Sequence, residues 1–128
     1  MMSKFYDIDL PFGEKYENTL SKILTTNTNN KIEVKTERDI WKSTGNIYVE
    51  LACREAFSGL VITKADWWAI IFTFDGAIEG IAILPTNLMR KRVKTLIKNK
   101  KAEYPIYGGD DDLSIGALVP IKELFYEE

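Results

Sequence analysis

The clearest structural signal in this chain lies in two short segments, KIEVKTE at residues 31–37 and NIYVEL at residues 46–51. Polar and apolar residues alternate along both. This alternation predicts two β-strands, because successive side chains of a strand point to opposite faces. Glu33 and Lys35 then share one face of the first strand, and Glu50 lies on the polar face of the second.

The two strands are expected to pair as an antiparallel hairpin with its turn near Trp41 to Gly45. That pairing places Glu33 roughly opposite Glu50, with the amine of Lys35 beside them. Two carboxylates and an ammonium on one patch of sheet are suited to bind a divalent cation and to activate water next to a phosphate.

The composition narrows the chemistry. At 128 residues and 45% hydrophobic content, the chain is expected to form a single domain over residues 1–128 with a proper core. It has no histidine, which excludes Ser-His-Asp and Cys-His catalysis and histidine zinc sites. The lone Cys53 cannot form an internal disulfide or a structural zinc cluster. Hydrolytic chemistry would therefore rest on carboxylates, lysine and a hard cation such as Mg²⁺.

The same features predict a location. A single cysteine favours a reducing compartment. The sequence shows no signal peptide and no apolar run of membrane-spanning length. We expect a soluble cytoplasmic protein with no membrane partner, acting in a host cell or encoded by something that infects one.

The order of the expected elements indicates an α/β sandwich around a mixed sheet. Besides the two strands above, the patterns predict a helix at 11–25, a central strand at 65–74, a turn at Asp75-Gly76, a return strand at 78–84, a basic helix capped by Thr86 or Asn87, and a strand at 114–119.

The basic helix has two possible roles. Residues 88–101 hold seven cations and no acid. Each of these side chains alone would simply solvate the outer face of the helix. As a group they form the footprint of a sequence-independent, salt-sensitive contact with a DNA backbone. The cations are Arg90, Lys91, Arg92, Lys94, Lys98, Lys100 and Lys101.

Trp41 and Lys42 lie at the expected hairpin tip, near the possible metal site. An exposed Trp41 there would stack on a base or wedge a DNA junction. The alternative is a buried Trp41 that caps the hairpin, which is the commoner fate of a tryptophan. Both alternatives stay open at this point.

Three segments resemble the PD-(D/E)XK nuclease superfamily, which includes restriction enzymes and Holliday-junction resolvases. GEKYENTL at residues 13–20 looks like the first helix of the resolvase branch, where a Gly is followed four residues on by a metal-site Glu; this selects Glu17 over Glu14. IEVKT at residues 32–36 looks like the family's acid-x-Lys strand. TGNIYVE at residues 44–50 is similar to small phage-encoded nucleases of this superfamily.

The resemblance implies a restriction-endonuclease-like core, with a mixed β-sheet flanked by helices. It implies a deoxyribonuclease dependent on Mg²⁺ or Mn²⁺. Glu33 and Glu50 would hold the metal, Glu17 would be an outer or second ligand, and Lys35 would position the attacking hydroxide. The resolvase-like helix further suggests branched DNA as substrate and a homodimer, since such resolvases cut as pairs.

One departure from the family pattern leaves two assignments open. The family usually has an Asp first and acid-x-Lys on the following strand, and no Asp closely precedes Glu33. In the first assignment Glu33 takes the Asp place, Glu50 is the second acid, and the lysine has moved to Lys35. In the second, Glu33-x-Lys35 is the motif, and Asp7 or Asp9 supplies the missing acid. The hairpin geometry favours the first.

Two other functions compete with the DNA nuclease. The first is a non-catalytic phage accessory module that binds DNA or a protein, with the same fold and a degenerate polar face. A nuclease directed at RNA is the third option.

Overall fold

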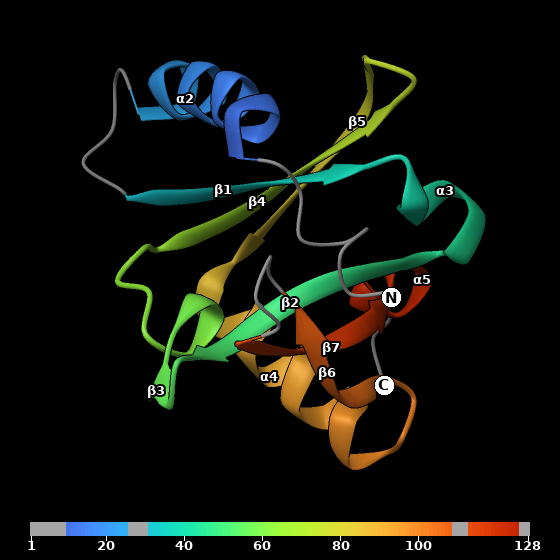
Figure 1. Cartoon of the computed structure of the whole chain (residues 1–128). Coiled ribbons are helices and arrows are strands. Elements are labelled where there is room, and N and C mark those ends of the chain that lie inside the picture. Colours follow the sequence, from blue (N-terminus) through green and yellow to red (C-terminus); the bar gives the residue numbers. More distant parts are fainter. Residues whose placement is uncertain (1–9, 26–30, 109–112, 126–128) are drawn as a thin grey trace.

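The computed structural model describes residues 10–25, 31–108 and 113–125 (Figure 1). The elements in these ranges are, in chain order, α2 (Leu10–Thr25), β1 (Ile32–Arg38), α3 (Ile40–Thr44), β2 (Asn46–Cys53), β3 (Ala56–Phe57), the 3₁₀ turn η1 (Gly59–Val61), β4 (Trp67–Phe74), β5 (Ala77–Pro85), α4 (Thr86–Lys98), β6 (Glu103–Gly108), β7 (Ser114–Pro120) and α5 (Ile121–Leu124).

The strands form two sheets, not one. The first has the order β1-β4-β5, with β1 parallel and β5 antiparallel to β4. The second has the order β3-β2-β7-β6 and is antiparallel throughout. The chain is thus a mixed α/β structure in which helices flank two sheets.

Strand β4 is central because both of its faces are apolar. Trp68, Ile70 and Phe72 on one face join the main core. Ala69 and Ile71 on the other face join a smaller cluster. A strand that is apolar on both sides must be covered on both, so it lies between neighbours and under a helix.

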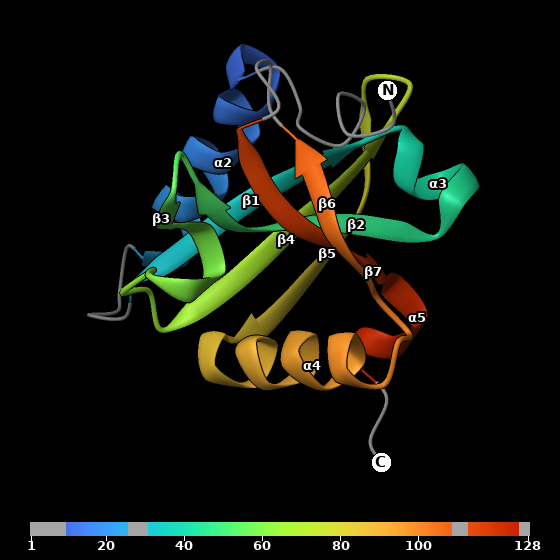
Figure 2. The same cartoon turned by 60° about the horizontal axis from the view of Figure 1, so that its bottom comes forward.

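The layers follow from these two clusters. Helix α2 covers the small cluster of the first sheet through Tyr16 and Leu20. The main core lies on the opposite face of that sheet, where the second sheet and α4 meet it. Figure 2 shows α4 below the two sheets and α2 above them.

The expected β1–β2 hairpin is wrong, although both strands exist. The connection between them contains α3, and Glu33 pairs in register with Trp68 of β4. Strand β2 instead pairs with β7, where Gly116 makes room for the Tyr48 ring: a Cβ on Gly116 would come within 2.7 Å of that ring. Alternation predicts which residues share a face of a strand, but it does not name the partner strand.

Most of the other elements are confirmed within one or two residues. The Asp75-Gly76 turn has positive φ at both residues, 51° and 80°, as a tight hairpin requires. The predicted side-chain cap of the basic helix is wrong, because Pro85 occupies the N-cap and no side chain caps α4. Strand β6 was not predicted. In the ranges described, no helix is long and apolar enough to cross a membrane.

Candidate functional site

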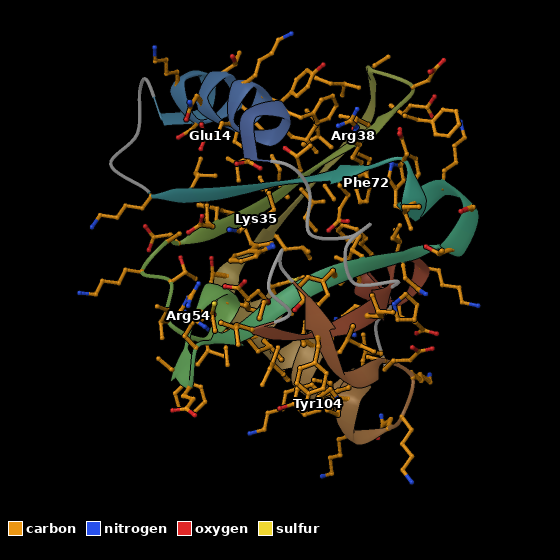
Figure 3. All side chains as sticks on the ribbon, in the orientation of Figure 1. Glu14, Lys35, Arg38, Arg54, Phe72 and Tyr104 are labelled. Atoms are coloured by element: carbon orange, nitrogen blue, oxygen red, sulfur yellow. The ribbon has the colours of Figure 1, made fainter. Side chains whose placement is uncertain are left out.

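The polar face of β1 brings Glu33 and Lys35 together at the edge of the first sheet. β1 is an edge strand, and these two side chains share their face with Trp68. Lys35 Nζ lies 3.6 Å from Glu33 Oε2 and 5.8 Å from the centre of the Trp68 ring. Figure 3 shows Lys35 on the side of β1 that faces β2, away from α2. The ammonium of Lys35 thus lies beside a carboxylate and near an aromatic ring.

Helix α2 brings Glu17 to the other face of β1, the face that carries Val34 and Thr36. Its carboxylate accepts hydrogen bonds from the hydroxyl and the backbone N–H of Thr36, the residue after Lys35. An edge strand has such N–H groups to offer on its unpaired side. Burial raises the pKa of Glu17, as the charge of Glu33 also does to a smaller extent, whereas Thr36 and Lys35 counteract the rise. Glu17 therefore lies within electrostatic reach of both Glu33 and Lys35.

Glu50 does not join this group, contrary to the hairpin geometry. It belongs to the second sheet, where its carboxylate accepts hydrogen bonds from Ser58 Oγ at 2.8 Å and from Ser114 Oγ at 2.9 Å. The prediction that Glu50 lies across a hairpin from Glu33 is wrong, because β1 pairs with β4 and not with β2.

One connecting segment links the two glutamates. Residues 58–63 run from Ser58, which binds Glu50, to Thr63, whose hydroxyl donates to Glu33 Oε1 over 3.2 Å. The 3₁₀ turn η1 lies between these two contacts. The segment therefore holds one carboxylate from each sheet.

Few carboxylates are available here to hold a metal ion. Among the described residues, no group of three or more His, Cys, Asp and Glu side chains is close enough to hold a metal ion. Mg²⁺ usually keeps several waters and is bound through one or two carboxylates together with substrate phosphates. Glu17 and Glu33 would supply that smaller set. Asp7 and Asp9, which the second assignment invokes, lie outside the described residues.

The cations of α4 divide into two groups. Arg90 is occupied within the protein: it donates to the carbonyl oxygens of Leu60 and Thr63. Arg92 is half-buried. The other three candidates are exposed and spaced three and four residues apart, which places them on one face of the helix: Lys91, Lys94 and Lys98.

Trp41 and Lys42 are engaged in packing. Trp41 is partly buried and packs against the core, so it matches neither alternative fully, since there is no hairpin to cap. Its Nε1 donates to the Thr73 carbonyl over 2.6 Å, and its ring meets the Phe72 ring edge to face at 5.1 Å. Lys42 Nζ lies 2.8 Å from Glu79 and 4.2 Å from the centre of the Phe74 ring. Both lie at α3 and not at a hairpin tip.

Sequence reasoning missed the hydroxyls that orient the carboxylates. They belong to Thr36, Ser58, Thr63 and Ser114. The one available signal was the position of Thr36, since the acid-x-Lys strand of the resembled family often continues with Ser or Thr. It also passed over Glu37, the third polar residue on the Glu33 face, which is 5% exposed.

A scan against protein-family models and searches of curated proteins and of solved structures found no match to this chain.

Proposed function

We propose that this protein is a metal-dependent deoxyribonuclease with a restriction-endonuclease-like core. The observation that supports this best is that Glu17 of α2 lies within electrostatic reach of the Glu33–Lys35 ion pair on the next element, β1. Two carboxylates and an ammonium at one exposed edge form a site that an extended DNA strand could reach.

Each residue has a role that follows from its surroundings. Glu33 and Glu17 would hold Mg²⁺ or Mn²⁺, which when bound lowers the pKa of a water and screens phosphate charge. Lys35 would offer a positive charge to the phosphate beside Glu33. Thr36 and Thr63 orient the two carboxylates.

Glu50 fits a supporting role better than a ligand role. Both of its oxygens already accept hydrogen bonds, one from Ser58 and one from Ser114. We assign it to the support of the segment that also reaches Glu33. The preference for branched DNA and the homodimer rest on the resemblance alone.

A cleavage assay tests the proposal. We expect nicking or cutting of DNA in the presence of Mg²⁺ or Mn²⁺ and none in EDTA. Glu33→Gln and Lys35→Met should each lower the rate at least about 100-fold, since each removes a charge used in the transition state. Supercoiled, linear, branched and single-stranded DNA, together with RNA, cover the substrate classes.

Glu14→Gln is the matched control, because Glu14 is an exposed carboxylate on the same helix as Glu17, one turn earlier. It should cut like the unmodified protein, and all variants should melt at similar temperatures. Full activity of folded Glu33→Gln would exclude this site.

A non-catalytic DNA-binding module remains the second candidate, and one observation favours it. Glu33 and Lys35 form an ion pair with each other, and no third acid of the described residues completes a metal group. Binding of DNA without cleavage under any of these conditions would support the module and reject the nuclease.

A further inference from the structure

An open groove with a mainly apolar lining lies beside α4. It has a volume of about 560 Å³, which is within the range of sites that bind ligands. Helix α4 contributes Val93 and Ile97 to the lining, and β3 and η1 contribute Phe57, Leu60 and Val61. The groove is thus built from elements that are distant from each other along the chain.

The lining leaves large apolar side chains in contact with solvent. Phe57 is 71% exposed, Tyr104 is 51% exposed and Val61 is 41% exposed. All three line the same groove, so this exposed apolar surface is gathered in one place. Apolar side chains that are exposed together mark interaction sites more often than singly exposed ones do.

The groove carries positive charge without a compensating acid. Its charged lining residues are Arg90 and Lys94, and no Asp or Glu of the described ranges lines it. Lys94 also belongs to the exposed row of Lys91, Lys94 and Lys98 on α4. The row therefore runs along the border of the groove.

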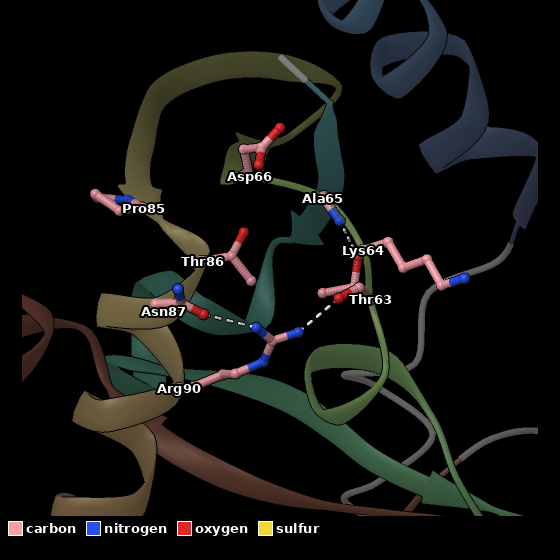
Figure 4. Close-up of a pocket in the computed structure, with 8 residues that line it drawn as sticks. All are labelled: Thr63, Lys64, Ala65, Asp66, Pro85, Thr86, Asn87 and Arg90. Atoms are coloured by element: carbon pink, nitrogen blue, oxygen red, sulfur yellow. Dashed lines mark hydrogen bonds between the residues drawn. The ribbon is translucent and has the colours of Figure 1, made fainter.

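Arg90 joins α4 to the segment on the other side of it. Its guanidinium donates to the Leu60 carbonyl over 2.8 Å and to the Thr63 carbonyl over 2.5 Å. It also donates to Asn87 Oδ1 over 2.8 Å, and Figure 4 shows it between Asn87 and Thr63. These acceptors are neutral oxygens, so they do not balance its positive charge.

The groove borders the segment that contacts both glutamates of the two sheets. Leu60 and Val61 belong to residues 58–63, whose two ends donate hydrogen bonds to Glu50 and Glu33. A ligand in the groove would therefore touch this segment directly.

We propose that this groove binds an acidic, amphipathic peptide segment of a partner protein. Apolar side chains of the peptide would enter the groove, and its carboxylates would lie along Lys94 and the neighbouring Lys91 and Lys98. An apolar groove is a recurring means of binding an amphipathic segment, and complementary charge gives such an interface its specificity. The proposal uses only the groove and its cations, so it does not rest on the proposed function.

The lining favours a peptide over a single-stranded nucleic acid. Bases stack on planar aromatic rings. Most of the apolar lining is instead aliphatic, and branched aliphatic side chains pack well around the apolar side chains of a peptide. The aliphatic residues are Leu51, Leu60, Val61, Val93 and Ile97. A single strand is therefore the alternative outcome of the test.

The test is a titration of the ¹⁵N-labelled full chain with short synthetic peptides, followed by amide chemical shifts. The first peptide combines leucine and phenylalanine with aspartate and glutamate in helical spacing. The second has glutamine in place of every acid, and the third has serine in place of every apolar residue. We expect saturable shifts at Val61, Val93 and Ile97 with the first peptide, weaker binding of the second and none of the third.

Val61→Asp tests the apolar lining. The change places a carboxylate where apolar side chains of the peptide would be buried, so the affinity for the first peptide should fall at least about tenfold. Ile62→Asp is the matched control, because Ile62 is the adjacent residue, is also exposed and does not line the groove. Both variants should melt close to the unmodified protein, since both side chains are exposed.

Lys94→Gln tests the charge of the groove. It should weaken binding of the acidic peptide about threefold, the size of one exposed ion pair. It should leave the affinity for the glutamine peptide unchanged. Lys15→Gln on α2 is the control and should bind both peptides as the unmodified protein does.

Three results would overturn the proposal: no saturable shifts at the groove amides, equal affinities in Val61→Asp and Ile62→Asp, or equal affinities for the acidic and glutamine peptides. A single-stranded oligonucleotide that shifts these amides where the peptides do not, and that Val61→Asp releases, would replace the peptide by a nucleic acid. None of these measurements involves DNA cleavage, so failure of the groove and failure of the nuclease are distinguishable.

Discussion

Glu17 shows how single residues at this site balance opposing forces. Burial has the largest effect on the pKa of Glu17 and raises it, whereas the Thr36 hydrogen bonds and the Lys35 charge lower it. This carboxylate lies within electrostatic reach of the ammonium of Lys35 and the second acid, Glu33. Perturbed acids of this kind gather at functional sites more often than elsewhere.

The raised pKa of Glu17 predicts a pH-dependent stability. The folded protein holds this proton more tightly than the unfolded chain, so the contribution is complete below the ordinary pKa and is lost as pH rises through the folded-state pKa. Glu17→Gln removes this loss. In thermal unfolding with EDTA, the variant should gain stability over the unmodified protein as pH rises from about 4 to about 7.

Glu14→Gln should show no such trend with pH, because Glu14 is exposed. A stability difference for Glu17→Gln that grows toward low pH would have the wrong sign and contradict the assignment.

The assignment of Glu50 to a supporting role gives a second prediction at this scale. Glu50→Ala deprives Ser58 and the buried Ser114 of their acceptor, which should lower the free energy of unfolding by about 1–3 kcal/mol. A metal ligand in a crowded acidic site would give the opposite sign in EDTA, since its removal relieves repulsion. Urea unfolding distinguishes the two, with the exposed Glu103→Ala on the same sheet as the control.

At the scale of elements, the segment of residues 58–63 connects three parts of the fold. It binds Glu50 of β2 through Ser58 and Glu33 of β1 through Thr63. Arg90 of α4 donates hydrogen bonds to the carbonyl groups of Leu60 and Thr63 in this segment. A segment without a long helix or strand of its own therefore sets the geometry of the candidate site.

Removal of the Arg90 hydrogen bonds should make residues 58–63 less stable against local unfolding. Arg90→Ala leaves the Leu60 and Thr63 carbonyls without their guanidinium donor and should cost about 1–3 kcal/mol of stability. Amide hydrogen exchange should become faster at residues 58–63 before it does in β4. Lys94→Ala, an exposed change on the same helix, should have an effect of less than about 0.5 kcal/mol; equal exchange in the two variants would refute the role of Arg90.

At the scale of the whole molecule, positive charge is concentrated on one helix of a chain with a net charge of -2. Lys91, Lys94 and Lys98 form an exposed row on α4. Under the proposed function, a DNA backbone would lie along this row.

The row predicts a change in the salt dependence of DNA binding. Each phosphate contact contributes about 0.9 to the slope of log affinity against log salt, so a variant with all three lysines changed to Gln should lose about 2.7 from that slope. Fluorescence anisotropy over a range of KCl concentrations measures it. Lys15→Gln on α2 serves as the control, and an unchanged slope in the triple variant would place the DNA elsewhere.

Local chemistry made much of the fold predictable. The alternation in residues 31–37 and 46–51 identified two strands, Asp75-Gly76 identified a hairpin turn, and the apolar run around Trp68 identified the central strand. Strand β6 escaped because a short strand with a proline among exposed tyrosines lacks the usual pattern. The pair Glu33 and Lys35 was also within reach, because side chains two apart on a strand share a face.

Sequence alone thus determined which side chains lie on the same face of each element, since that depends only on neighbours along the chain. The tertiary structure decided which elements meet. β1 joined β4 and β2 joined β7 because β4 is apolar on both faces and must be enclosed, and because Gly116 makes room for Tyr48. These are packing requirements between distant parts of the chain, which the local pattern does not contain. As a result Glu50 lies in the second sheet and not opposite Glu33. Thr63 instead donates a hydrogen bond to Glu33, and Arg90 binds the Thr63 carbonyl.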